Sequence, residues 1–490
     1  MAKISFGTDG WRGILARDFT FDNVALVARA VAGYVQAHGL AGRGMVIGYD
    51  NRFLSDQLAA TVAGVFTGLG IPVYMTGRAT PTPVTAFAVK QRRAAGAVML
   101  TASHNPPEYN GFKFIPDYAG PALPHITKEI EDNIHRLQEE AGGEKSALPA
   151  TPAGPGTAPG TNAPPAAGRM EPAAEEVVDP RPDYFAHIRN LVDLSAIARS
   201  GLKVVIDPMY GAGIGYLEEL LGEAGARVTV LHNRRDPLFG GGLPEPTGKS
   251  LGELRELVRE QEADLGLALD GDADRFGIID RDGGYIPPNQ FLPLLYYHLL
   301  TRGERGPAAR TVATSHLLDR IAAANGQEVF ETPVGFKYIG QHLMEKDCLL
   351  GGEESGGLSV RGHIPEKDGI LAGLLAARMV AQHGKSLAAL LEEVWARFGR
   401  LYSERLDIRT TAEEKRRVLG LLGELNPARV AGLSVVRRVT LDGIKLVLDN
   451  GAWMLVRASG TEPVFRIYVE ANSAEEMRRI QEGARELLGI

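Results

Sequence analysis

Short apolar runs recur along the chain and alternate with longer segments of helical periodicity. The clearest runs occupy residues 45–49, 96–100, 203–207 and 265–269. Runs of this length between helical segments are typical of buried strands in a mostly parallel sheet that helices cover. A chain of 490 residues is too long for one core, so we predict an α/β protein of three or four domains.

A serine follows the run 96–100 at a point where the chain must turn. Residues 101–107 read TASHNPP, and the prolines cannot continue a sheet ladder. Parallel sheets bind ligands at the carboxyl ends of their strands, and a hydroxyl held there can carry a covalent group. Ser103 is therefore a candidate group carrier. It does not form a nucleophile elbow, because the flanking glycines are missing, and a polar turn without chemistry is the alternative.

Three aspartates follow the run 265–269. Asp270, Asp272 and Asp274 take alternate positions, which share one face of an extended segment. Their carboxylates would repel one another unless a cation lay between them, and oxygen ligands suit Mg²⁺ or Ca²⁺. An EF-hand is excluded because Arg275 occupies the position of its glycine. The alternative to a metal site is a solvated acidic turn.

Two later loops carry residue types that bind sugars and phosphates. Residues 351–357 (GGEESGG) place Glu353 and Ser355 on one face, where they could bind vicinal hydroxyls, although a flexible turn explains the glycines equally well. Residues 457–463 (RASGTEP), followed by Arg466, combine two arginines with hydroxyls and a glycine. That combination is typical of a phosphate cradle.

Three other segments bear on the organisation of the chain. Residues 147–174 are rich in Ala, Pro, Gly and Thr and have no periodicity, which predicts a linker or a disordered insertion. The glycines of 211–215 have the wrong spacing for a dinucleotide-binding loop. Near Tyr402 the pattern changes to a charged helix and then a hairpin, whose Asn450-Gly451 dipeptide is typical of a type I′ turn.

Composition narrows the function classes. A net charge of -7 argues against a dedicated nucleic-acid binder. The single cysteine, Cys348, allows no intrachain disulfide and fits a reducing cytoplasm. The chain has no apolar run of transmembrane length and no signal-peptide core at its start, so we expect a cytoplasmic protein without a membrane partner.

Four of the loops together resemble the α-D-phosphohexomutase family, which includes phosphoglucomutase, phosphomannomutase and phosphoglucosamine mutase. The matching segments are 101–106, 270–275, 352–356 and 457–463, and they follow in the order of the family. The resemblance covers the chain outside the insertion. It implies an α/β fold of three similar domains with mixed sheets, plus a C-terminal α+β domain, around a central active-site cleft.

The resemblance also implies a division of the chain and a set of site residues. The segments are domain I with the phosphoserine loop (1–146), a linker or disordered insertion (147–178), domain II with the metal loop (179–299), domain III with the sugar loop (300–400) and domain IV with the phosphate loop (401–490). The residues implied at the reacting end are Ser103, His104, Lys113, Arg12 and Arg275. The ligands implied for Mg²⁺ are Ser103, Asp270, Asp272 and Asp274. The residues implied to bind the substrate are Lys337, Glu353, Ser355, Arg457, Ser459, Gly460, Thr461 and Arg466.

The implied reaction is the reversible conversion of glucose 1-phosphate to glucose 6-phosphate through a phosphoserine enzyme. Glucose 1,6-bisphosphate would be both intermediate and activator. Glu354 and the pair Phe336-Lys337 resemble the phosphoglucomutase branch. The alternatives are a phosphomannomutase or dual-specificity enzyme and, less favoured, a phosphoglucosamine mutase. Hexose phosphates would be the binding partners, and the chain would be a monomer or a homodimer.

The chain departs from one branch of the family at two positions. Phe336 and Gly357 stand where that branch has histidines, so no proton-transfer role carries over to them. The candidates for the general base are Lys113, His104 and Lys337. Two other function classes stay open at this point, a sugar-phosphate sensor with the same fold and a metal-dependent phosphatase.

Overall fold

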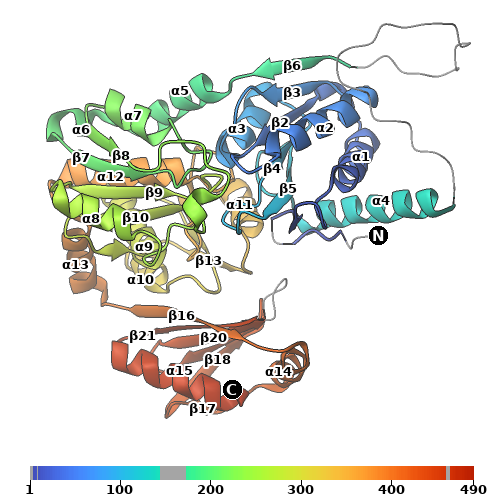
Figure 1. The fold of residues 1–490 in the computed structure, drawn as a ribbon. Helices are drawn as coiled ribbons and strands as arrows, with labels where there is room; N and C mark the ends of the chain where they lie inside the picture. The colour runs from blue at the N-terminus through green and yellow to red at the C-terminus, as the bar shows by residue number, and fades with distance from the viewer. Residues whose placement is uncertain (1–3, 8, 144–172, 459–463, 490) are drawn as a thin grey trace, which may run out of the picture.

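The computed structural model describes residues 4–489 except for residue 8 and the segments 144–172 and 459–463. Four sheets, each with its own helices, organise these residues, and we name the four parts units I to IV in chain order. Units I, II and III pack together, and unit IV lies at the bottom of the view, below unit III (Figure 1). In the described ranges, no helix is both long and apolar enough to span a membrane.

Unit I is built around a six-stranded mixed sheet. Its elements are β1 (Trp11–Ile14), α1 (Phe21–Ala37), the 3₁₀ turn η1 (Ala41–Arg43), β2 (Met45–Tyr49), α2 (Ser55–Gly68), β3 (Val73–Thr76), α3 (Thr82–Arg92), β4 (Gly96–Leu100), β5 (Tyr109–Pro116), α4 (Pro124–Gly143) and β6 (Glu175–Val178). The strand order is β1-β5-β4-β2-β3-β6. The central strands β2 and β4 pair in parallel, and β5 runs antiparallel to β4 and β1. As the apolar run predicts, every residue of β4 is buried.

The edge strand β6 lies inside the segment for which a linker was expected. Its residues pair in parallel with β3, from Val73 opposite Glu175 to Thr76 opposite Val178. Only two of these four residues are apolar, so the sequence gives a weak strand signal. A strand at the edge of a sheet buries fewer side chains and can form with few apolar residues. The expected insertion at 147–172 lies outside the described residues.

Unit II repeats the α/β plan with five strands. Its elements are α5 (Arg181–Leu191), α6 (Ser195–Ser200), β7 (Lys203–Asp207), α7 (Leu217–Glu223), β8 (Arg227–Val230), η2 (Phe239–Gly241), α8 (Gly252–Glu260), β9 (Leu265–Leu269), β10 (Phe276–Asp280) and β11 (Tyr285–Ile286). The order is β11-β10-β9-β7-β8, with β7 parallel to β8 and β9, and β10 antiparallel to β9.

Unit III has four strands and five helices within its described residues. Its elements are α9 (Pro288–Thr301), β12 (Ala308–Thr311), α10 (Leu317–Ala324), β13 (Val329–Thr332), α11 (Phe336–Glu345), β14 (Leu350–Gly352), β15 (Leu358–Val360), α12 (Gly369–His383) and α13 (Leu387–Phe398). The order is β13-β12-β14-β15, and only β15 pairs antiparallel. One apolar core runs continuously through units I, II and III.

Unit IV is an antiparallel sheet with two helices. Its elements are β16 (Tyr402–Arg409), α14 (Ala412–Glu424), β17 (Arg429–Val430), β18 (Leu433–Val439), β19 (Ile444–Leu448), β20 (Trp453–Ala458), β21 (Val464–Ala471) and α15 (Ala474–Leu488). The order is β16-β21-β20-β19-β18-β17. The predicted fold class is confirmed: three α/β units with mixed sheets are followed by an α+β unit.

Two local predictions for unit IV need correction. The strand β16 precedes the charged helix, and its charged and polar residues, which are largely exposed, hide the period-two pattern. The hairpin between β19 and β20 is present, but its turn is not type I′. Gly451 alone has a positive φ, of 84°, and Leu448 donates from its main-chain N–H to the carbonyl of Ala452. A three-residue loop that ends in a left-handed glycine has this geometry.

Candidate active site

Ser103 lies in the tight turn that joins β4 to β5. It is 1% exposed, and its backbone has a left-handed φ of 53°. Its Oγ donates a hydrogen bond to Oδ2 of Asp270 at 2.7 Å, and Nδ1 of His104 lies 3.2 Å from the same Oγ. The turn therefore delivers a hydroxyl of unit I to the aspartate loop of unit II. Strained backbone of this kind clusters at functional sites.

Arg52, in the loop between β2 and α2, holds the serine turn in place. Its guanidinium is buried, and Nε lies 3.2 Å from Oδ2 of Asp50. The ring of Phe239 in unit II faces the guanidinium, with 4.9 Å between the ring centroid and Cζ. The other guanidinium nitrogens donate to four main-chain carbonyls at 2.6–3.0 Å, those of Ser103, Asn105, Pro106 and Tyr109.

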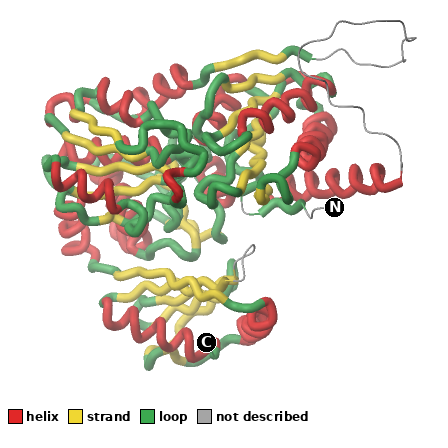
Figure 2. Tube along the Cα trace, viewed as in Figure 1, coloured by secondary structure: helices red, strands yellow, loops and turns green. Residues whose placement is uncertain are grey.

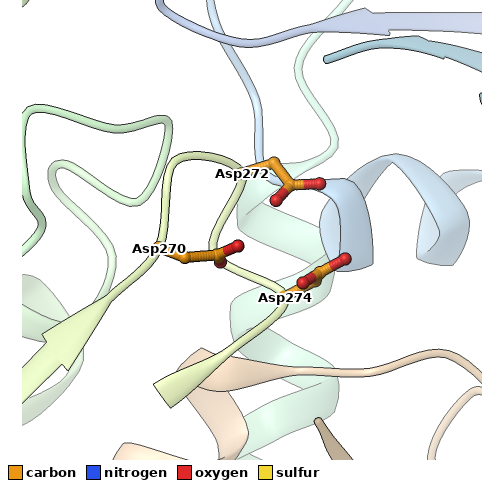
Figure 3. Close-up of side chains that lie close together, drawn as sticks. All are labelled: Asp270, Asp272 and Asp274. Carbon is orange, nitrogen blue, oxygen red and sulfur yellow. The ribbon is translucent and has the colours of Figure 1, made fainter. Parts of the chain in front are cut away.

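The three aspartates follow β9, and their carboxylates face a common space (Figure 3). One oxygen from each lies within 4.8 Å of the others, and all three side chains are buried. Oδ1 of Asp272 and Oδ1 of Asp274 have no hydrogen-bond partner. Unpaired carboxylate oxygens are costly to bury, and a divalent cation with oxygen ligands would satisfy them. The donor set of this loop therefore fits Mg²⁺.

The serine turn and the aspartate loop touch each other closely. A Cβ built on Gly271 would lie only 2.5 Å from the main-chain oxygen of Ser103, so glycine is required there. Thr82, at the start of α3, adds a second link. Its Oγ1 donates to Oδ2 of Asp272 at 2.6 Å, and its N–H donates to the main-chain oxygen of the same residue at 3.0 Å. The two loops thus form a single site.

Two buried lysines face the carboxylates. Nζ of Lys113 lies 2.8 Å from Asp272, 2.9 Å from Asp274 and 2.9 Å from Asp9. Nζ of Lys367 lies 3.0 Å from Asp9 and 3.2 Å from Asp274. Burial opposes their charged forms, but the carboxylates outweigh it and raise the pKa of both lysines. Lys113 therefore joins β5 to the aspartate loop.

The remaining residues expected at the reacting end gather around the serine turn. Burial, followed by the charges of Arg275 and Arg12, lowers the pKa of His104 well below its usual range, so its imidazole is neutral. Arg12 donates from Nη1 to Oδ1 of Asn105. The main-chain N–H of Arg275 donates to Oδ1 of Asp270 at 3.0 Å. All five residues expected at the reacting end are thus linked by these contacts.

The expected sugar loop of unit III, residues 351–357, lies against the aspartate loop of unit II. The main-chain N–H of Phe276 donates to the carbonyl of Gly356 at 3.2 Å, and the N–H of Gly369 donates to the carbonyl of Ala273 at 3.1 Å. Figure 2 shows loops gathered in the middle of the molecule, between units I and II. The carboxyl ends of strands from different sheets therefore meet, as expected for ligand sites in α/β sheets.

Within the sugar loop, Glu353 is the buried acid. Its Oε1 accepts a hydrogen bond from the N–H of Gly335 at 2.9 Å. Burial, together with the neighbouring charge of Glu354, raises the pKa of Glu353 to about 7. Ser355 and Lys337 are half-buried, and burial lowers the pKa of Lys337.

The expected phosphate cradle belongs to unit IV. Arg457 and Arg466 face each other across β20 and β21. Nη2 of Arg457 lies 2.8 Å from Oδ2 of Asp442, and that oxygen accepts a hydrogen bond from the N–H of Val334 in unit III at 3.0 Å. Asp442 thus connects the cradle to the loop before α11. The other expected cradle residues, Ser459, Gly460 and Thr461, lie outside the described residues.

Three residues of this site were missed in the sequence, namely Asp9, Arg52 and Lys367. A signal existed for Arg52, because Asp50 and Arg52 directly follow the apolar run 45–49. The strand-end rule that pointed to Ser103 applies equally there. Asp9 and Lys367 lie 358 positions apart, and nothing local pairs them.

Comparison with known proteins places the chain in a family. Four family profiles match in succession and are described as phosphoglucomutase/phosphomannomutase alpha/beta/alpha domains I (residues 3–141), II (182–284) and III (287–398) and the C-terminal domain (412–487). A Thermococcus kodakarensis protein named phosphoglucomutase/phosphomannomutase is 31% identical over 98% of this chain and 97% of its own. A Methanothermobacter thermautotrophicus protein, provisionally named phosphoglucosamine mutase, is 33% identical over 98% and 96%.

A solved structure agrees over the whole length. A Thermus thermophilus protein, provisionally named phosphomannomutase, superposes with a TM-score of 0.83 at 36% identity and covers 100% of both chains. The chain belongs to the phosphoglucomutase/phosphomannomutase family, the α-D-phosphohexomutases. It is accordingly an intramolecular phosphotransferase that isomerises hexose phosphates.

Proposed function

We propose that the protein interconverts glucose 1-phosphate and glucose 6-phosphate by passing a phosphoryl group through Ser103. The observation that carries the proposal is the position of Oγ, 2.7 Å from Oδ2 of Asp270, beside two carboxylates with unpaired oxygens. Packing alone does not explain why Ser103 should sit in a strained turn. The left-handed φ of 53° is explained if the turn aims Oγ at a substrate.

In the proposed reaction the phosphate on Ser103 passes to the free hydroxyl of a hexose monophosphate. The hydroxyl oxygen bonds to phosphorus, the Oγ–P bond breaks, and the hydroxyl proton goes to a base. The resulting bisphosphate turns end for end, and its other phosphate returns to Oγ. The candidates for that base are Lys113, His104 and Lys337; the imidazole of His104 is neutral, and its Nδ1, 3.2 Å from Oγ, is placed to exchange a proton with the serine oxygen.

Charge balance accounts for the other residues at the reacting end. A phosphoserine carries about -1.5 to -2 charges and needs cations near it. Asp270, Asp272 and Asp274 would hold Mg²⁺ with the phosphate of Ser103, and the bound ion would stabilise negative charge on the transferring group. Arg12, Lys113 and Arg275 would supply further positive charge. Glu353 and Ser355 would bind sugar hydroxyls, and Lys337 would contact the substrate. The phosphate that does not react would bind the cradle formed by Arg457, Ser459, Gly460, Thr461 and Arg466.

One incubation separates this proposal from its rivals. The full chain is mixed with glucose 1-phosphate, Mg²⁺ and a trace of glucose 1,6-bisphosphate, and the products are followed by ³¹P NMR. We expect glucose 6-phosphate to accumulate until equilibrium. Release of inorganic phosphate without isomerisation would identify a phosphatase, and an unchanged substrate that nevertheless binds would identify a sensor.

For the sugar, we propose a preference for glucose over mannose, and for both over glucosamine. The named relatives divide among these sugars, so the proposal rests on Glu354 and the Phe336-Lys337 pair. In the structure, Thr311 and Thr314 donate to Oε2 of Glu354 at 2.9 and 3.3 Å, which fixes the sugar loop against β12. A misplaced hydroxyl costs about 1 kcal/mol, a few-fold in rate, so measurable activity on mannose 1-phosphate is expected. Values of kcat/KM for the three sugar 1-phosphates test the ranking, and a clear preference for glucosamine 1-phosphate would overturn it.

A further inference from the structure

Away from the active site, Arg378 on α12 is buried, and two of its guanidinium nitrogens have no partner among the residues that the structure describes. The residue is 5% exposed, and its Nε and Nη2 atoms have no hydrogen-bond acceptor. Among the residues that the structure describes, no carboxylate forms an ion pair with it. A guanidinium is charged at every physiological pH, so its burial requires compensation.

The surroundings of Arg378 add positive charge. Burial, followed by repulsion from Arg302 at the end of α9, lowers the pKa of Arg378, and the carboxylates of Glu304 and Asp193 offset this only in part. Both carboxylates and Arg302 are exposed. The carboxyl ends of α9 and α12 contribute partial negative charge, but none of their carbonyls accepts a hydrogen bond from Arg378.

The polar side chains next to Arg378 interact with one another and not with its guanidinium. His298 on α9 contacts His383 on α12, with 3.1 Å between Nδ1 of the first and Nε2 of the second. The buried side chain of Gln382, one helical turn from Arg378, interacts with the His298 imidazole. The unpaired Nε and Nη2 of Arg378 therefore lie where α9 lies beside α12 and α6 packs on α12, and the neighbouring polar side chains do not satisfy them. Figure 1 shows these helices on the side of units II and III away from unit I.

A second buried arginine in unit III shows what compensation looks like. Arg310 is 2% exposed, and its guanidinium lies 2.7 Å from Asp319 and 2.8 Å from Glu331. Breaking such a buried pair strongly destabilises a protein, because a buried charge is left without a partner. Arg378 is in that unpaired state unless something outside the polypeptide compensates it.

We propose that Arg378 is a binding site for a small anion with two parallel oxygens, such as a formate-sized carboxylate. The atoms Nε and Nη2 lie on one edge of the guanidinium, and that edge matches two such oxygens in a bidentate pair. Arg302 stands at the rim of the site and adds attraction for the anion. Because α6 belongs to unit II and α12 to unit III, the bound anion would stabilise the contact between these units.

The test uses thermal unfolding of the full chain in phosphate-free buffer, with sodium formate replacing sodium gluconate at constant ionic strength. Gluconate is too large for a site within the helix packing and serves as the inert anion. We expect the parent Tm to rise by a few degrees and then saturate, as binding to the folded state requires. Arg378→Lys and Arg378→Met should lose this rise. The matched control is Arg310→Lys, which alters another buried arginine. Formate should raise the Tm of this variant by the same number of degrees as that of the parent, even if the two proteins differ in Tm without formate.

Two outcomes would overturn the proposal. A formate shift of parental size in both Arg378 variants would place the anion elsewhere, for example at the phosphate cradle. No shift in the parent would mean that water alone solvates Arg378. If the variants do not fold, crystals of the parent soaked in sodium bromide decide the matter. An anomalous bromide peak beside Nε and Nη2 supports the site. The absence of that peak refutes the proposal. A peak without any formate-dependent rise of Tm in solution indicates an adventitious ion only, and also refutes it.

Discussion

The proposed reacting end and the proposed phosphate cradle are held by opposite kinds of structure. At the reacting end, Ser103, Asp272 and Lys113 are buried, and their loops are tied by hydrogen bonds within a core that runs through units I, II and III. The cradle belongs to unit IV, whose sheet packs α14 and α15 on one face around a core of its own. The other face meets unit III through a small cluster that includes Trp453 and Tyr468.

This structural difference suits the two tasks that we propose for these parts of the site. Phosphoryl transfer needs charges that are already in place, because reorganising them during the reaction would raise the barrier. A cradle must accept either end of the sugar and admit and release the bisphosphate, so it benefits from a body that can move as one piece. Substitutions at the reacting end should therefore change chemistry, whereas those between units III and IV should change stability and closure.

The largest effect is expected for Ser103→Ala. Without the carrier hydroxyl, turnover should fall by about a thousandfold or more, as for other covalent enzymes. Intact mass should show a phosphate adduct on the parent and none on the variant, and Tm should change little. Ser359→Ala is the control, because that buried serine only donates to the carbonyl of Ile364 at 2.6 Å and should keep the adduct. Turnover near the parental rate in Ser103→Ala would refute the covalent mechanism.

The second effect tests the metal. Asp272→Asn removes one ligand charge while keeping the shape, so Mg²⁺ should bind more weakly and the rate should fall by orders of magnitude. Titration of activity against Mg²⁺ should show a higher half-saturating concentration for the variant. EDTA should abolish parental activity, and added Mg²⁺ should restore it. An enzyme that stays fully active in EDTA would show that the aspartates only balance the two lysines.

The third effect concerns the positioning of the serine turn. Arg52→Lys keeps a charge beside Asp50 but cannot donate to four carbonyls at once. A small displacement of Ser103 should lower kcat by about ten- to a hundredfold, while KM changes little. The split between kcat and KM is the informative measurement, because general destabilisation would not separate the two. If kcat is unchanged when Ser103 is fully phosphorylated, the turn keeps its conformation without the hydrogen bonds of Arg52.

The strand ends of the site could be predicted from the sequence, whereas its long-range contacts could not. Apolar runs that end in Ser103 and in the three aspartates were visible, because strand burial and strand ends obey local rules. The convergence of the loops was implied only by family resemblance, since hydrogen bonds such as Thr82 to Asp272 join residues 190 positions apart. The strand β16 was missed because its charged and polar residues face solvent. Lys367 was missed because its partners, Asp9 and Asp274, come from two other units.

The smallest effect tests the contact between units III and IV through Lys445. Its Nζ donates to the carbonyl of Val312 at 2.7 Å and lies 2.8 Å from Nε2 of His316 and 2.7 Å from Glu331. Burial, followed by the charge of Arg310, lowers the pKa of Lys445 to about 8. In the unfolded chain the pKa of a lysine is about 10.4.

The sign of the pH dependence follows from these two values. Between pH 8 and about 10.4 the unfolded chain binds more protons at Lys445 than the folded chain does, so this residue makes stability rise with pH in that window. Lys445→Met cannot titrate there. The difference in Tm, parent minus variant, should therefore increase by a few degrees at most from pH 7.5 to pH 10. Groups that titrate alike in both proteins do not contribute to this difference. A flat difference would mean that Lys445 keeps its ordinary pKa, and hence that water reaches the interface between units III and IV even in the folded protein.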